Sequence, residues 1–274
     1  MPAADLEQRG ILLRQAVRDA GALAMDYFNN GAKAWDKAED DPVTEADLAV
    51  DSLLRDRLLS ANEDDGWLSE ESEQEPHAPD HPKIWVVDPI DGTRAFIDGK
   101  PHFTICAGLV VDGEAVLAAV YNPAKEEFFE AEAGKGARCN GQPIQVSDHQ
   151  ALAGCKMISY RAMFDDKHWR TPWPKINISM VNSIAYRIAL VARGDYDACI
   201  NLRPQNDWDI LAAELILREA GGRCTNRDGD RYRFHGKGGK NQNVIVANPT
   251  LQEKLLQKLT EFEPVFPKSA QTKK

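Results

Sequence analysis

The chain has 274 residues, 43% of them hydrophobic, with 43 Asp and Glu against 33 Lys and Arg and a formal net charge of −10. This length can bury a large core as one large domain or two smaller ones. The acidic balance argues against binding to a nucleic-acid polymer or an anionic membrane, because both carry phosphates. A small anionic substrate would need a local source of positive charge, such as a metal ion.

The cysteines and the N-terminal residues indicate a compartment. The five Cys are odd in number and widely spaced, without a Cys-x-x-Cys pair, so we expect reduced core thiols. Asp5, Glu7, Arg9 and Arg14 stand where a signal peptide would need an apolar segment. No apolar run approaches ~18 residues, the length of a membrane-spanning helix. The sequence therefore predicts a soluble cytoplasmic protein.

The first half predicts two helices and then a sheet. Apolar residues recur at helical spacing over residues 13–28, and a second helix is expected over residues 44–59. Residues 62–82 are rich in acids and proline, so we expect mostly solvated loop, and the apolar run 84–87 predicts a buried strand. Further strands are expected at 103–111, 114–121 and 127–131, the first two joined by the hairpin signal Asp112-Gly113.

From about residue 150 the pattern alternates between strands and helices. We expect strands near residues 156–159, 196–200 and 243–247, and helices over 183–192 and 208–220. The second helix would end at Gly221-Gly222. This predicts an antiparallel-sheet half over residues 1–149, an α/β half over 150–266 and a polar tail over 267–274.

Two carboxylates follow the predicted strand at 84–87. In Asp88-Pro89-Ile90-Asp91-Gly92-Thr93, both Asp can converge on one cation across a bend that Pro89 restricts. Gly92 lets the backbone approach a ligand closely. Thr93 begins a short predicted helix, whose N-terminal N–H groups can bind phosphate. Alone, this segment could equally be an ordinary turn, because Asp-Gly is a common turn dipeptide.

Taken together with further motifs, this segment favours a metal site over an ordinary turn. The full set of motifs consists of Asp41-Pro42-Val43-Thr44-Glu45-Ala46-Asp47, Leu68-Ser69-Glu70-Glu71, Trp85 to Thr93, and Trp208-Asp209-Ile210-Leu211-Ala212-Ala213, followed by Glu219-Ala220-Gly221-Gly222. In order and separation they closely resemble the signature of the inositol monophosphatase superfamily of metal-dependent, lithium-sensitive phosphomonoesterases. The resemblance covers roughly residues 5–250. It implies an α+β fold, a five-layer αβαβα sandwich with the active site between its halves, and a possible homodimer.

The resemblance also implies roles for individual residues. Glu70, Asp88 and the Ile90 carbonyl would hold one Mg²⁺, and Asp88, Asp91 and Asp209 a second. Glu70 with Asp91 could contact a weaker third ion, and Mn²⁺ could substitute.

The resemblance implies that Asp47, Thr93 and Glu70 are catalytic residues. Asp47 would orient the Thr93 hydroxyl that helps to activate water, and Gly92 with Thr93 would contact the phosphate. Asp47 has a second explanation, since Thr44 to Asp47 is close in form to a helix capping box. Glu71 is either an outer carboxylate of the site or a solvated loop acid.

Competing chemistries fit less well. An aspartyl-phosphate phosphatase needs a carboxylate two residues before Asp91, where this chain has Pro89. Cys155 and Arg161 have the spacing of a thiol phosphatase, but the residues between them lack Gly and predict a strand. A non-enzymatic calcium-binding module would need oxygen ligands where Ile90 and Gly92 stand.

The expected reaction is Mg²⁺-dependent hydrolysis of a small phosphate monoester by metal-activated water. Candidate substrates are 3′-phosphoadenosine 5′-phosphate or inositol monophosphate, with histidinol or sugar phosphates as alternatives. Arg94-Ala95-Phe96 and Ser69 depart from inositol-specific members and favour the bisphosphate nucleotidase branch. Arg94, Ser183 and Arg203 are expected to contact substrate, and Arg203 could meet a second phosphate.

Overall fold

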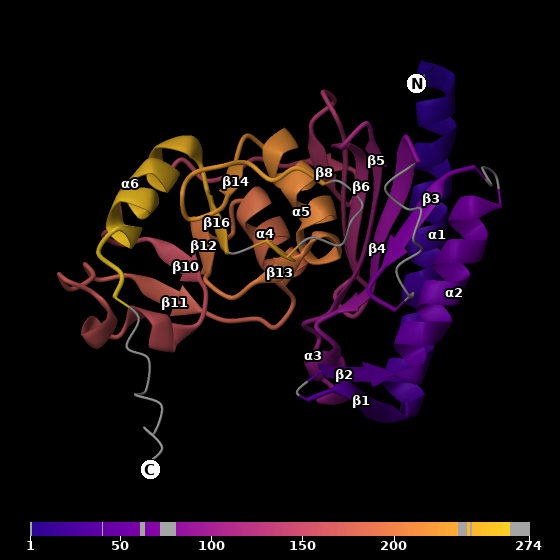
Figure 1. The fold of residues 1–274 in the computed structure, drawn as a ribbon, viewed down its shortest axis with the longest axis horizontal. Coiled ribbons are helices and arrows are strands. Elements are labelled where there is room, and N and C mark those ends of the chain that lie inside the picture. The colour runs from indigo at the N-terminus through magenta and orange to yellow at the C-terminus, as the bar shows by residue number, and fades with distance from the viewer. Residues whose placement is uncertain are drawn as a thin grey trace, which may run out of the picture.

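The computed structural model describes residues 2–39, 41–60, 64–71, 81–234, 240–241 and 243–263. The predicted tail at 267–274 lies outside these ranges. Five layers follow one another, as Figure 1 shows: two helices, a sheet, two helices, a second sheet and a last helix. This confirms the predicted αβαβα sandwich.

Within the described residues, the first sheet has seven strands in the order β3-β4-β5-β6-β7-β8-β9, and only the β3–β4 pair is parallel. The strands are β3 (Gly66–Ser69), β4 (Lys83–Asp91), β5 (Thr104–Val111), β6 (Glu114–Asn122), β7 (Glu127–Glu132), β8 (Ala137–Cys139) and β9 (Gln142–Pro143). One face is covered by α1 (Ala3–Asn30) and α2 (Glu45–Leu59). At the turn between β5 and β6, Asp112 and Gly113 both have positive φ, 52° and 83°, which confirms the predicted hairpin.

β4 is buried on both faces, which explains its continuous apolar run. Trp85 and Val87 belong to the core beneath α1 and α2. Ile84 and Val86 belong to the core on the opposite face, which the middle helices α4 (Ile184–Ala192) and α5 (Asp207–Glu219) complete.

The prediction of mostly solvated loop over residues 62–82 is wrong for β3. All four of its residues are buried, and Trp67 and Leu68 lie beside Trp85 and Val86 of β4 in parallel register. Asp65, just before β3, accepts hydrogen bonds from the buried Arg9 of α1 and from the Trp85 indole. The apolar pair therefore adds a buried edge strand where the surrounding acids and prolines had indicated a loop.

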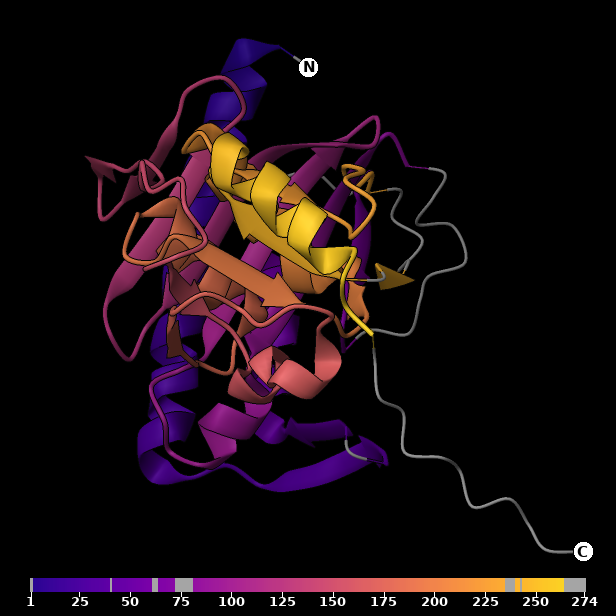
Figure 2. The ribbon, with the colours of Figure 1, turned by 90° about the vertical axis from the view of Figure 1, so that its left-hand side faces the viewer.

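The second sheet has five strands in the order β11-β10-β12-β16-β14. They are β10 (Lys156–Ile158), β11 (Asn177–Ser179), β12 (Ala198–Asn201), β14 (Arg223–Thr225) and β16 (Val244–Ala247). β10 is parallel to β11 and β12, and β16 is antiparallel to β12 and β14. The outer face is covered by α6 (Pro249–Leu259), which Figure 2 shows lying across the sheet. No sequence pattern had predicted α6.

The shorter elements lie mainly around one end of the sandwich. They are the hairpin β1 (Ala34–Ala38) and β2 (Asp41–Thr44), the helix α3 (Thr93–Ile97), the 3₁₀ turns η2 (Arg161–Phe164) and η3 (Asp166–His168), and the pair β13 (Gln205–Asn206) and β15 (Lys240–Asn241). Figure 1 shows α3 beside the β1–β2 hairpin. All five cysteines are buried free thiols, as expected. No helix in the described ranges has the length and apolar character to cross a membrane.

Candidate active site

A bulge in β4 brings its two aspartates to one side of the sheet. Residues three apart in a regular strand point to opposite faces. Asp88 pairs with Cys106 of β5 and Asp91 with Thr104, so β4 has one residue more than β5 between these pairs. The extra residue shifts the alternation by one. Asp88 and Asp91 consequently line the same cavity.

Gly92 makes a close approach to the chain's own backbone. Its φ is 100°, and a Cβ built there would lie 2.7 Å from the His102 carbonyl oxygen and 3.3 Å from the Ser183 nitrogen. Only glycine fits such a position without strain. The turn directs the chain from β4 into α3, which begins at Thr93 as predicted.

Asp91 is held by the beginning of α4. Its Oδ2 accepts hydrogen bonds from the Ser183 hydroxyl at 2.6 Å and from the Ala185 N–H at 2.7 Å. Ser183 is also the N-cap of α4 and lies 2.9 Å from the Thr104 hydroxyl. Because Ser183 is fully buried and does not line the cavity, the predicted substrate contact does not fit its position. Ser183 instead holds Asp91.

Asp47 has the geometry of both of its predicted roles. It accepts the Thr44 N–H at 2.9 Å and the Thr44 hydroxyl at 2.5 Å, completing a capping box at the start of α2. Its other oxygen, Oδ1, lies 3.2 Å from the Thr93 hydroxyl, which is also 3.1 Å from the Ile90 carbonyl. The cap therefore fixes the carboxylate in contact with Thr93.

Asp209 occupies the same place in α5 that Asp47 occupies in α2. It is the third residue of the helix, and its Oδ2 accepts the Asn206 N–H at 2.6 Å. Thus two helix N-termini, one from each sequence half, each hold an aspartate at the site. Asp209 lines the cavity itself, whereas Asp47 contacts Thr93, which lines it.

Glu70 and Glu71 share one cation from the β1–β2 hairpin. The Lys37 ammonium is 3.1 Å from the Glu70 carboxylate and 2.8 Å from that of Glu71, whose side chain is 2% exposed. Glu71 is therefore not a solvated loop acid. The Ser69 hydroxyl accepts the Glu71 N–H at 3.3 Å and donates to Asp51 of α2, which fixes the turn that carries Glu70. Lys37 went unnoticed in the sequence because no motif distinguishes it from other charged hairpin residues.

Burial and mutual repulsion raise the pKa values of the acids at the site. Burial raises the pKa of Asp88 and Asp209 well above its ordinary value, and the neighbouring carboxylates raise it further. Burial also raises the pKa of Asp47 and of Asp91 to about 6, although hydrogen bonds from Thr44 and Ser183 respectively oppose the shift. So many buried acids in one place are unfavourable without a cation.

The donor set fits a hard divalent cation. Asp88 Oδ1 is buried and has no hydrogen-bond partner among the described residues. Buried polar atoms are rarely left unpaired, so this oxygen has the character of a ligand atom. Within the same ranges, no three Asp, Glu, His or Cys side chains already converge as a metal cage.

The cavity at these acids has a volume of about 450 Å³. It brings together residues of both halves, from Asp41, Glu70, Asp88, Ile90, Asp91, Gly92, Thr93 and Arg94 to Tyr160, Asn182, Pro204, Gln205, Asn206 and Asp209. Arg94 is exposed on its wall. Arg203 is not on this wall but lines a neighbouring cavity. No sequence motif had pointed to Tyr160 as a residue of the cavity.

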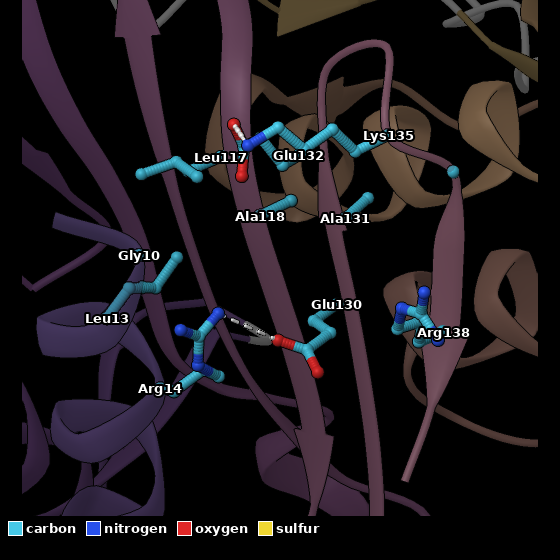
Figure 3. Close-up of a pocket in the computed structure, with 11 residues that line it drawn as sticks. Gly10, Leu13, Arg14, Leu117, Ala118, Glu130, Ala131, Glu132, Lys135 and Arg138 are labelled. Carbon is cyan, nitrogen blue, oxygen red and sulfur yellow. Dashed lines mark hydrogen bonds and ion pairs between the residues drawn. The ribbon is translucent and has the colours of Figure 1, made fainter. Parts of the chain in front are cut away.

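Two alternative sites are poorer candidates. A cavity of about 290 Å³ lies between α1 and β6 to β8, and Figure 3 draws the residues that line it. Arg14 pairs there with Glu130 at 3.3 Å, and Lys135 with Glu132 at 2.7 Å. Its acids are already paired, so it lacks a reason to hold a metal. Cys155 is fully buried next to the β10 strand, which excludes the thiol-phosphatase loop.

The chain is similar to known proteins over most of its length. A model of the inositol monophosphatase family matches residues 5–263. A histidinol-phosphatase of Chlorobaculum parvum is 32% identical, the match covering 89% of this chain and 94% of that protein. An inositol-1-monophosphatase of Rhizobium meliloti is 33% identical, the match covering 78% and 84% of the two chains. The solved structure of a Thermotoga maritima IMPase has a TM-score of 0.78 at 28% identity, covering 90% of this chain and 94% of that one.

The matches extend over nearly the whole chain and include proteins named for phosphatase activity. The family is generally metal-dependent, as the buried acids here would require. The chain belongs to the inositol monophosphatase family and is a phosphomonoesterase that acts on small phosphorylated substrates.

Proposed function

We propose that the chain hydrolyses a small phosphate monoester in a reaction that depends on Mg²⁺. The observation that carries this proposal is the buried Asp88 Oδ1, which has no hydrogen-bond partner among the described residues. It lies within a group of mutually repelling acids, beside the Thr93–Asp47 pair. Glu70, Asp88, the Ile90 carbonyl, Asp91 and Asp209 would hold two or three ions, with Mn²⁺ able to substitute. When bound, Mg²⁺ supplies positive charge that lowers the pKa of a bound water and offsets charge on the phosphoryl oxygens.

The chain's own residues would manage the proton of the attacking water. The Thr93 oxygen can accept a hydrogen bond from that water while the Thr93 hydroxyl donates to Asp47 Oδ1, 3.2 Å away. Because burial raises the pKa of Asp47 to about 6, this carboxylate is a better proton acceptor than an ordinary Asp. Glu70 provides a second carboxylate on the cavity wall. Backbone N–H groups at Gly92 and Thr93 would contact the phosphate.

For the substrate, we propose 3′-phosphoadenosine 5′-phosphate ahead of inositol monophosphate. The Arg94-Ala95-Phe96 segment and Ser69 support the nucleotidase branch, and Arg94 adds a cation to the cavity wall. Histidinol phosphate is a second candidate, because a relative 32% identical to this chain is named for that activity. The cytoplasmic location and the homodimer remain predictions from the sequence.

Phosphate release from a panel of esters tests the proposal. The panel contains 3′-phosphoadenosine 5′-phosphate, inositol 1-phosphate, histidinol phosphate and glycerol 2-phosphate, each with Mg²⁺, with excess chelator, and with added lithium. We expect turnover only with metal, the highest kcat/KM for the nucleotide, and inhibition by lithium. Full activity after exhaustive chelation would contradict the metal role. A preference for inositol or histidinol phosphate would overturn the substrate assignment alone.

A further inference from the structure

The helix α4 carries a buried positive charge, Arg187. This residue is 2% exposed, and among the described residues it forms no ion pair with a carboxylate. A charge buried this deeply is unfavourable unless its donors are paired. The groups that hold the guanidinium therefore indicate what it supports.

Two backbone carbonyls and one aromatic ring hold this guanidinium. Its Nε donates to the Val181 carbonyl at 2.6 Å, and a terminal nitrogen donates to the Asn182 carbonyl at 3.1 Å. The guanidinium carbon also lies 4.8 Å from the centre of the Tyr160 ring. A planar, forked cation can make all three contacts at once, which a point charge such as an ammonium cannot. Arg187 thus ties the segment before α4 to the segment after β10.

Both of the tied segments reach the cavity at the acids. Tyr160 and Asn182 line this cavity together with Asp88 and Asp91, whereas Arg187 does not line it. Tyr160 is 39% exposed, so solvent reaches its ring, and the buried guanidinium gives the ring a fixed surface to lie against. The Asn182 side chain forms no hydrogen bond within the described part of the chain, so its amide is available to a ligand.

The acid side of the cavity has anchors of its own. Asp91 is held by the Ser183 hydroxyl and the Ala185 N–H, at the beginning of α4. The Arg187 side chain bonds instead to the two residues that precede Ser183. A phosphate bound at the acids would leave the alcohol part of an ester to the remaining wall, which the second half of the chain contributes. Arg187 therefore supports the part of the cavity that faces the alcohol.

We propose that Arg187 is a positioning residue that fixes Tyr160 and Asn182 as the wall against which the alcohol part of the substrate lies. The inference rests on the proposed function, because it needs the ester phosphate to lie at the acids. It does not depend on which alcohol the ester carries. Arg187 would act on ester binding rather than on the hydrolysis step, since its partners belong to this wall and not to the acids.

Replacing Arg187 with Lys tests this role, because Lys keeps the charge but cannot hold two carbonyls and a ring together. The substrate is whichever of 3′-phosphoadenosine 5′-phosphate, inositol 1-phosphate and histidinol phosphate the native enzyme hydrolyses fastest. Its KM should rise about tenfold with kcat nearly unchanged, while the inhibition constant of inorganic phosphate should change less than about twofold. Inorganic phosphate has no alcohol part, so it reports on the acids alone.

The control variant is Arg193→Lys, just after α4. The Arg193 side chain pairs with Glu127 and Asp195 and lies outside the cavity at the acids. This variant also exchanges a paired, partly buried guanidinium for an ammonium, yet it should leave both the KM of the ester and the inhibition constant of phosphate unaltered.

Replacing Tyr160 with Ala provides a second readout that leaves the buried cation in place. Tyr160 is exposed, so the variant should fold. It should raise the KM of the ester and leave the inhibition constant of phosphate unaltered. Because Arg187 acts partly through Tyr160, adding Arg187→Lys to Tyr160→Ala should raise KM by less than the product of the two separate effects.

Three results would overturn the inference: an unchanged KM in Arg187→Lys, a large fall in its kcat, or equal increases in its KM and in its inhibition constant for phosphate. The last two would place the effect of Arg187 at the acids. If Arg187→Lys did not fold, an unchanged KM in Tyr160→Ala would still overturn the inference. If the native enzyme hydrolysed none of these esters with Mg²⁺, the proposed function would fail and the inference with it.

Discussion

Replacing Asp47 with Asn separates capping from catalysis, because a cap needs only a hydrogen-bond acceptor whereas catalysis needs a carboxylate that can take a proton. Asp47 is 1% exposed, and burial raises its pKa from 3.8 to about 6. An acid with a raised pKa in the folded state destabilises that state once it ionises, by about 1.4 kcal/mol per pKa unit. The ionised carboxylate thus costs about 3 kcal/mol at pH 7.5.

Asn is neutral and has nearly the same shape, and its amide oxygen can still accept the Thr44 N–H. We expect Asp47→Asn to stabilise the metal-free protein at pH 7.5 by about 1–3 kcal/mol, the lower value allowing for weaker, uncharged hydrogen bonds. Below about pH 4 the gain should vanish, because the carboxyl is then protonated in both states.

Activity should move in the opposite direction. An amide cannot take the Thr93 proton, so kcat at saturating Mg²⁺ should fall about 100-fold or more. Urea unfolding in chelator at pH 7.5 and steady-state kinetics measure the two effects. Asp56→Asn, an exposed acid on the same helix, should change stability by less than ~0.5 kcal/mol and leave kcat unaltered. Near-native turnover together with reduced stability in Asp47→Asn would refute the catalytic role.

Three further predictions concern the surroundings of the acids. Burial raises the pKa of Asp91 to about 6 and that of Glu71 to about 7. Their contribution to stability is therefore present below about pH 4 and is lost as pH rises through 6 and 7. Calorimetry should show Mg²⁺ stabilising the protein more at pH 7.5 than at pH 5, and a pH-independent effect would contradict this. Ser69→Ala removes the hydroxyl that joins Asp51 to the Glu71 N–H. In a Mg²⁺ titration of activity, the Mg²⁺ concentration at half-saturation should rise about tenfold while kcat stays nearly unchanged. An unaltered titration would show that Ser69 does not help to hold the acids in place. Gly92→Ala should destabilise the protein by at least ~1 kcal/mol more than Gly99→Ala. Both glycines have positive φ, but an added Cβ would lie 2.7 Å from the His102 carbonyl oxygen at Gly92 and would meet no atom within 4 Å at Gly99. Equal losses in thermal unfolding would show that the close approach is unimportant.

The sequence alone determined the main elements, because their signals are local, and the resemblance carried by its motifs implied the fold class. Helical periodicity predicted α1, and the Asp112-Gly113 pair predicted the β5–β6 hairpin, since few dipeptides adopt two consecutive positive φ angles so readily. The motifs also named the acids that line the cavity, because residues at the ends of strands and helices retain recognisable spacing. β3 was missed because its short apolar pair is stabilised by pairing with β4 rather than by local preference.

Only the tertiary structure decided which residues support the acids of the candidate site and which distant residues join them. The bulge that turns Asp88 and Asp91 to one side depends on the register between β4 and β5, which is a property of two strands. Ser183 reads as a substrate contact in sequence, yet burial behind Asp91 gives it a holding role. Lys37 meets Glu70 and Glu71, and Tyr160 meets Arg187 and Arg203, only because the chain folds distant segments together. Such contacts have no local sequence signal, since their free energy comes from burial and charge in the folded protein.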